Sequence, residues 1–166
     1  MVGRRQRTSH ADLVLDRSPI ALELASRDAS NIRGAADAFV LASSVEDVVR
    51  VVRECRRRKQ PFVARGAGTG LAAGAIPDLG GVVVSLMGMN RIREINPVER
   101  WAWVEPGVLN ADLSRATRRF GLHFAPDPSS QQSCTIGGNL STNAGGTSVL
   151  RYGNARELCL GLEVVM

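Results

Sequence analysis

A short glycine-rich segment, Arg65-Gly66-Ala67-Gly68-Thr69-Gly70, limits most strongly what this chain can fold into. It follows an apolar stretch, residues 61–64, that is typical of a strand. The next residues, 71–81, contain four helix breakers, Gly74, Pro77, Gly80 and Gly81. A regular helix behind the loop is therefore excluded. This excludes a Rossmann turn, because such a turn leads into a helix. A phosphate-binding P-loop is also excluded, because residues 65–81 contain no lysine.

The remaining interpretation is a glycine loop between two strands. Successive backbone N–H groups of such a loop can line an anion site, and glycine lets a phosphate approach closely. The side chain of Arg65 would add positive charge if it faced the same ligand. A mobile surface loop without a ligand explains residues 65–74 equally well when they are taken alone.

The composition favours a folded domain and excludes several classes of function. The chain is 44% hydrophobic and 22% charged, which suits a globular core. Its net charge is +5, but aromatic residues make up only 4%, so we expect no nucleic-acid partner. The three cysteines have no metal-ligand spacing, and no apolar run approaches the roughly 20 residues of a transmembrane segment. We expect a cytoplasmic protein, with peripheral attachment to a membrane left open.

The first half of the chain predicts a small lobe built from strand, helix and strand. Ser18 and Pro19 begin a helix over 18–26, and residues 38–41 are a buried strand. Ser43 and Glu46 then form the capping box of a second helix. Its inward face is predicted to consist of Val45, Val48, Val49, Val52 and Cys55. Strands at 61–64 and 82–86 follow, and we expect parallel pairing.

The second half predicts a different lobe. Residues 91–96 and 101–105 read as an antiparallel hairpin, followed by an amphipathic helix over 109–120 that Gly121 ends. The inward residues of this helix are predicted to be Leu109, Leu113, Ala116 and Phe120. A last strand over 158–165 reaches nearly to Met166, so we expect a fold that is incomplete at its C-terminus, with an exposed sheet edge.

These elements define an α+β fold with three parts. Residues 1–35 form an N-terminal arm and helix, 36–90 a first lobe, and 91–166 a second lobe.

The residues from 126 to 146 indicate that the glycine loop has a ligand. They contain Pro126, Asp127 and Ser129, followed by a run of Gly, Asn, Ser and Thr. Ordering two such stretches without a partner would be costly, and their hydroxyls and amides suit phosphates, ribityl hydroxyls and a polar ring edge.

The order of motifs PFVARGAGTGLAAGA, GGVVVSL, VEPGV, APDPSS, TIGGNLSTNAGG and RYGNARELCLGLEVV resembles one known family. It is that of the FAD-linked oxidases with an FAD-binding domain of the vanillyl-alcohol oxidase/p-cresol methylhydroxylase type. Within this family the chain looks most like the glycolate oxidase FAD subunit and the D-lactate dehydrogenases. The resemblance implies a two-lobed FAD domain, with a small βαβ lobe, an antiparallel-sheet lobe and the cofactor between them.

The resemblance also implies which residues hold FAD. The pyrophosphate would lie on Arg65, Gly66, Ala67, Gly68, Thr69, Gly70 and Leu71. The flavin and its ribityl chain would lie by Pro126, Asp127, Ser129, Thr135, Gly137, Gly138 and Asn139. The pocket would be completed by Asn143, Gly145, Gly146, Tyr152 and Gly153. Because residues 65–74 contain neither His nor Cys, we expect noncovalent FAD. We expect no metal, because no Cys or His of the chain has metal-ligand spacing.

The implied reaction is hydride transfer from the α-carbon of a small 2-hydroxy acid to FAD, after which an external electron acceptor reoxidises the flavin. The family continues beyond the predicted last strand into a substrate-binding cap domain. No catalytic residue can therefore be assigned, and the alternative is a truncated or accessory FAD-binding subunit that needs a partner chain. A sugar-nucleotide enol reductase of the same fold is a third hypothesis, which the PDPSS and NAGG motifs disfavour.

Overall fold

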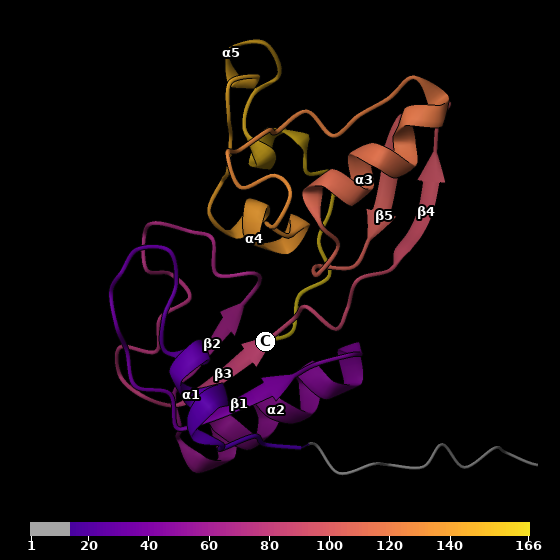
Figure 1. Ribbon diagram of the computed structural model, residues 1–166. Coiled ribbons are helices and arrows are strands. Elements are labelled where there is room, and N and C mark those ends of the chain that lie inside the picture. Colours follow the sequence, from indigo (N-terminus) through magenta and orange to yellow (C-terminus); the bar gives the residue numbers. More distant parts are fainter. Residues whose placement is uncertain (1–13) are drawn as a thin grey trace, which may run out of the picture.

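The computed structural model describes residues 14–166, and the predicted N-terminal arm at 1–10 lies outside this range. The helices and strands form two groups, shown in Figure 1 in indigo to magenta and in orange to yellow. Helix α1 (Pro19–Ala25) begins as predicted, because the Ser18 hydroxyl accepts a hydrogen bond from the Ala21 N–H and Pro19 occupies the first turn.

The first group is built on a small parallel sheet. Strands β1 (Ala38–Leu41), β2 (Phe62–Arg65) and β3 (Val82–Ser85) lie in the order β1-β3-β2, and both outer strands pair parallel with β3. Helix α2 (Val45–Arg58) connects β1 to β2 across the central strand. The predicted parallel pairing is thus confirmed. All four residues of β3 are buried, as the valine-rich sequence of a central strand requires.

Helix α2 corrects two details of the prediction. The N-cap is Ser44, whose hydroxyl accepts a hydrogen bond from the Asp47 N–H, whereas Ser43 donates to the Asp47 carboxylate from outside the helix. The cap therefore lies one residue later than the Ser43 and Glu46 pair predicts. The inward face is Val45, Val48, Val51 and Cys55, so Val51 replaces the predicted Val49 and Val52 in the core.

The second group contains the predicted hairpin and helix. Strands β4 (Ile92–Asn96) and β5 (Trp101–Val104) pair antiparallel, and α3 (Asn110–Thr117) with the short 3₁₀ helix η1 (Arg118–Phe120) ends at Gly121, whose φ is +71°. The core of this group is formed by Val108, Leu113 and Ile136. The inward prediction fails for Phe120, which is exposed because the chain tightens into a 3₁₀ turn before reaching it.

The C-terminal part differs most from the prediction. The glycine-rich stretch contains an unpredicted helix, α4 (Ile136–Ser141), followed by α5 (Val149–Tyr152) and the 3₁₀ helix η2 (Ala155–Leu158). The predicted strand over 158–165 is wrong, since no strand is assigned there. Within the described residues no neighbouring strand pairs with it, and an alternating sequence alone does not make a strand. Leu160 and Leu162 are consequently exposed.

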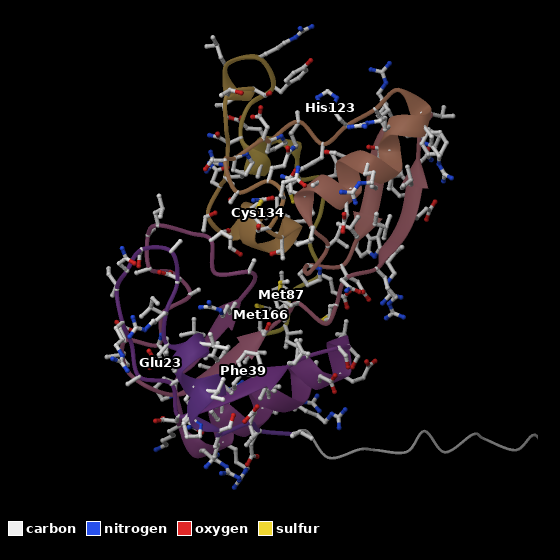
Figure 2. All side chains as sticks on the ribbon, viewed as in Figure 1. Glu23, Phe39, Met87, His123, Cys134 and Met166 are labelled. Carbon is white, nitrogen blue, oxygen red and sulfur yellow. The ribbon has the colours of Figure 1, made fainter. Side chains whose placement is uncertain are left out.

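The two groups of elements agree with the two predicted lobes, while the boundaries at 35/36 and 90/91 stay a prediction. Figure 2 shows all described side chains on the same view, with Met87 between the groups. In the range 14–166, no helix has the length and apolar character needed to span a membrane.

Candidate functional site: a glycine loop between two lobes

The two glycine-rich stretches come into direct contact. A Cβ atom placed on Gly66 would overlap the Thr135 hydroxyl, and the Gly138 Cα lies next to the same position. Thr135 is fully buried and begins α4, where its hydroxyl accepts a hydrogen bond from the Gly138 N–H at 3.2 Å. The end of β2 can therefore approach α4 this closely only because residue 66 is glycine.

The segment that follows α1 holds the loop after β2 in place. Gly68 has a φ of +70°, which turns the chain sharply, and its carbonyl accepts a hydrogen bond of 3.0 Å from the Ala29 N–H. The Arg65 guanidinium lies against the Cα of Gly68, at the place a side chain there would occupy. A Cβ on Gly70 would meet nothing within 4 Å, so the loop is open on that side.

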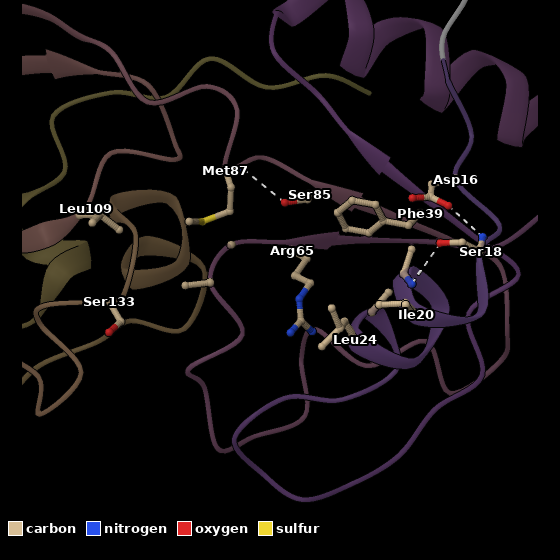
Figure 3. A pocket seen from close by; sticks show the side chains of 14 residues that line it. Asp16, Ser18, Ile20, Leu24, Phe39, Arg65, Ser85, Met87, Leu109 and Ser133 are labelled. Atoms are coloured by element: carbon tan, nitrogen blue, oxygen red, sulfur yellow. Dashed lines mark hydrogen bonds between the residues drawn. The ribbon is translucent and has the colours of Figure 1, made fainter.

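A pocket of about 760 Å³ lies beside this loop, within the roughly 300–1,000 Å³ that small-molecule sites occupy. Arg65, Gly66 and Ala67 form one part of its wall. Figure 3 shows the Arg65 side chain extending toward Leu24 of α1. The remaining wall is largely apolar and comes from both lobes, with Ile20, Leu24, Phe39, Met87 and Leu109 among its side chains. An apolar pocket beside a glycine loop suits a dinucleotide, which has a flat ring next to its phosphates.

The electrostatics of the loop favour an anion. Arg65 is half-buried, and this burial lowers the pKa of its guanidinium, an effect that the negative charge of Asp28 opposes. An arginine nevertheless stays protonated in a protein. Its Nη1 atom is buried and has no hydrogen-bond partner among the described residues. A buried cationic donor, an open glycine loop and an adjoining pocket together fit the pyrophosphate of FAD.

The structure places Asp127 at a turn of the second lobe, and its role beside the flavin stays a prediction. Its carboxylate accepts hydrogen bonds from the Ser148 N–H (2.9 Å), the Ser148 hydroxyl (2.9 Å) and the Thr147 hydroxyl (2.8 Å). These donors hold the pKa of Asp127 below its ordinary value, with the Ser148 N–H as the first cause. A Cβ on Gly146 would overlap the Asp127 carbonyl. Asp127 therefore fixes the turn at residues 146–148.

Replacing Asp127 with asparagine should loosen this turn. An amide oxygen is a weaker acceptor than a carboxylate, and the second oxygen is lost. We expect the Ser148 amide to exchange its hydrogen about tenfold faster, as local opening becomes easier. Hydrogen exchange resolved to single residues measures this. Unchanged exchange at Ser148, against a Ser141→Ala control in α4, would contradict the assigned role.

Behind the loop, a buried polar network joins α3 to α4. The Asn110 side-chain N–H₂ donates to the Pro126 carbonyl (2.9 Å) and to the Asn139 side-chain oxygen (3.0 Å). The Asn139 N–H₂ in turn donates to the Cys134 sulfur at 3.2 Å. The amides of Asn110 and Asn139 thus fix the backbone at residues 126 and 134–139. Apart from its position at a helix start, no sequence pattern marks Asn110 as part of this network.

The other predicted residues are divided between the loop and a distant part of the second lobe. Thr69 continues the loop half-buried, Leu71 and Ser129 are exposed, and Gly137 packs against Pro106. Figure 1 places α5 on the far side of α4 from β2. Three of the predicted residues, Asn143, Gly145 and Gly153, contact residues 149–157, and the Tyr152 ring lies edge-on to that of His123. None of these contacts is with the glycine loop, and the place of these four residues beside FAD stays a prediction.

A small parallel sheet, a glycine loop without a following helix and a second lobe resting on that loop define the two-lobed fold of FAD-dependent oxidases. Among solved structures, 6-hydroxy-D-nicotine oxidase from Arthrobacter nicotinovorans superimposes with a TM-score of 0.72. It is 22% identical, and the match covers 90% of this chain and 32% of that protein, which shows the fold alone.

The model of the FAD binding domain family matches residues 36–166, and the chain belongs to this family, whose cofactor is FAD. The chain is 46% identical over 125 residues to the glycolate oxidase subunit GlcD of Escherichia coli, covering 75% of this chain and 25% of that protein. It is 42% identical over 131 residues to D-2-hydroxyglutarate dehydrogenase of Stutzerimonas stutzeri, covering 79% and 28% respectively. The chain thus spans about a quarter of the length of these relatives.

Proposed function

We propose that this chain is the FAD-binding portion of a flavin-dependent dehydrogenase that oxidises a small 2-hydroxy acid of the D-lactate or glycolate type. The observation that carries the proposal is the contact between Gly66 and Thr135, which joins two separate glycine-rich stretches next to a pocket. The similarity to a glycolate oxidase subunit and to a D-2-hydroxyglutarate dehydrogenase supports the substrate class.

In this proposal the residues of the chain bind and orient the cofactor. The backbone of Gly66–Gly70 and the charge of Arg65 would hold the pyrophosphate, while Thr135 and Gly138 would border it from the second lobe. Bound FAD supplies the acceptor for a hydride from the α-carbon of the hydroxy acid, leaving a 2-oxo acid and a proton. An external acceptor then takes up the electrons. We expect noncovalent binding, because residues 65–74 offer no His or Cys for a bond to the flavin.

The substrate site and the compartment are also part of the proposal. The relatives are about four times as long as the matched region, so we propose that a further domain or a partner chain supplies groups that hold the hydroxy acid. Cys55, Cys134 and Cys159 are all free thiols, which suits the reducing cytoplasm, with peripheral membrane attachment still open.

The substrate class is tested with the protein at its natural length, purified and loaded with FAD. Under anaerobic conditions, D-lactate or glycolate should bleach the flavin absorbance near the visible maximum, whereas the L-lactate control should leave it unchanged. A flavin that stays oxidised with D-lactate, glycolate and D-2-hydroxyglutarate would contradict the proposed substrate class.

A further inference from the structure

Two buried charged atoms lie on segments that a backbone hydrogen bond joins, although no ion pair links the two atoms within the described residues. They are the Nη1 of Arg65, at the end of β2, and the Oδ2 of Asp28, in the segment after α1, and neither has a hydrogen-bond partner among the described residues. One is a cationic donor and the other an anionic acceptor. Isolated buried charges are unfavourable, so an arrangement in which these two compensate each other is favoured.

The backbone ties these two segments together. The Ala29 N–H, directly after Asp28, donates to the Gly68 carbonyl at 3.0 Å. The other carboxylate oxygen of Asp28, Oδ1, accepts from the Ser30 N–H (2.8 Å) and the Ser30 hydroxyl (2.5 Å). Ser30 thereby fixes the carboxylate and leaves Oδ2 for a different partner. The carboxylate of Asp28 is also the charge that supports the protonated form of Arg65.

The guanidinium of Arg65 is in contact with the glycine loop itself. It occupies the place that a side chain on Gly68 would need, at the residue whose positive φ turns the loop. The guanidinium thus packs directly beside the backbone at Gly68. A group that fixes Arg65 also fixes the loop whose N–H groups are proposed to bind the pyrophosphate.

We propose that Asp28 is a positioning residue for the FAD site, acting through Arg65 to hold the loop Gly66–Gly70 in the conformation that receives the pyrophosphate. This inference rests on the proposed FAD site at that loop. Asp28 lies before the region that matches the FAD binding domain family, residues 36–166, so the N-terminal segment becomes part of the site.

The test measures the dissociation constants of FAD and of ADP for the full chain and its variants. Asp28→Asn should weaken binding of both ligands about tenfold, because ADP carries the pyrophosphate without the flavin. The matched control is Asp78→Asn, which removes an exposed carboxylate from the same β2–β3 connection and should change neither constant. Ser30→Ala, which keeps the Asp28 charge and the hydrogen bond from the residue 30 N–H but removes the one from the hydroxyl, should cause a smaller loss.

A double-mutant cycle separates positioning from a purely structural role. Asp28→Asn should add little to the loss caused by Arg65→Met, because the carboxylate acts through the guanidinium. Melting temperatures without ligand check that each variant is folded. If the unmodified chain binds neither FAD nor ADP, the proposed function itself fails. If it binds both, and Asp28→Asn binds equally well or its effect is fully additive with Arg65→Met, only the positioning role is overturned.

Discussion

Replacing Gly66 with alanine is expected to weaken FAD binding by about tenfold or more. The added Cβ would overlap the hydroxyl of Thr135, a fully buried residue that cannot move aside. Overpacking of this kind costs typically about 1–3 kcal/mol, and about 1.4 kcal/mol corresponds to a factor of ten in a dissociation constant. The loop and α4 would be pushed apart where the two lobes meet. Titration of the variant with FAD, followed by flavin fluorescence, measures the effect.

Two further variants make this result specific. Gly74→Ala lies in the same β2–β3 connection, and its Cβ would meet nothing within 4 Å, so FAD affinity should not change. Thr135→Ala in the Gly66→Ala background removes the overlapping hydroxyl and should restore part of the affinity. Equal affinities for Gly66→Ala and the unmodified chain would mean that the contact between the lobes does not shape the site.

Replacing Glu105 with glutamine is expected to destabilise the fold by about 2 kcal/mol, since hydrogen bonds to charged groups contribute roughly 1.5–3 kcal/mol. The Glu105 carboxylate is only 5% exposed and accepts from the Arg91 N–H (2.7 Å), the Arg91 guanidinium (2.9 Å) and the Arg93 guanidinium. It thereby ties the residue after β5 to the start of β4. Chemical denaturation at pH 7 measures the difference.

The effect of this substitution should depend on pH. Hydrogen bonds from Arg91, Arg93 and the Arg91 N–H lower the pKa of Glu105 from 4.5 to about 2, the Arg91 side chain being the first cause. Because the pKa of Glu105 is lower in the folded chain than in the unfolded chain, its charge stabilises the fold. This contribution is fully present above the unfolded-state pKa of 4.5 and is lost as the pH falls toward 2. The difference in the free energy of unfolding between the unmodified chain and Glu105→Gln should therefore become smaller below pH 4.5. Glu94→Gln, on the exposed side of β4, is the control. If the difference in unfolding free energy between the unmodified chain and Glu105→Gln does not change with pH, the assigned ion pair is contradicted.

The regular elements could be predicted because local patterns determine them. The valine-rich strands and the spacing of Val45, Val48 and Cys55 are visible in the sequence, and the structure confirms the strands and helix that they predict. Helix α4 was missed, because its sequence IGGNLS contains two glycines, which disfavour a helix. Tertiary contacts outweigh this preference: Thr135 caps the helix, Gly137 packs on Pro106, and Asn139 bonds to Asn110.

The site was predictable as far as its glycines and the neighbouring Arg65 and Thr135. Two backbone segments that approach closely require glycine at the contact, so the loop at 65–70 and the residues Gly137 and Gly138 can be recognised in the sequence. The polar residues that join segments distant in sequence leave no such signature. Asp28, Glu105 and Asn110 each act on a segment distant in sequence, and their roles depend on packing that no local pattern encodes.

The pyrophosphate site is tested most directly by titrating the purified chain with FAD, monitored by flavin fluorescence, with riboflavin as a parallel titrant. We expect saturable binding of FAD at one molecule per chain, inhibition of that binding by ADP, and much weaker binding of riboflavin, which lacks the pyrophosphate. A folded chain that leaves FAD fluorescence unchanged, or that binds riboflavin as tightly as FAD, would contradict the assignment of the glycine loop as the pyrophosphate site.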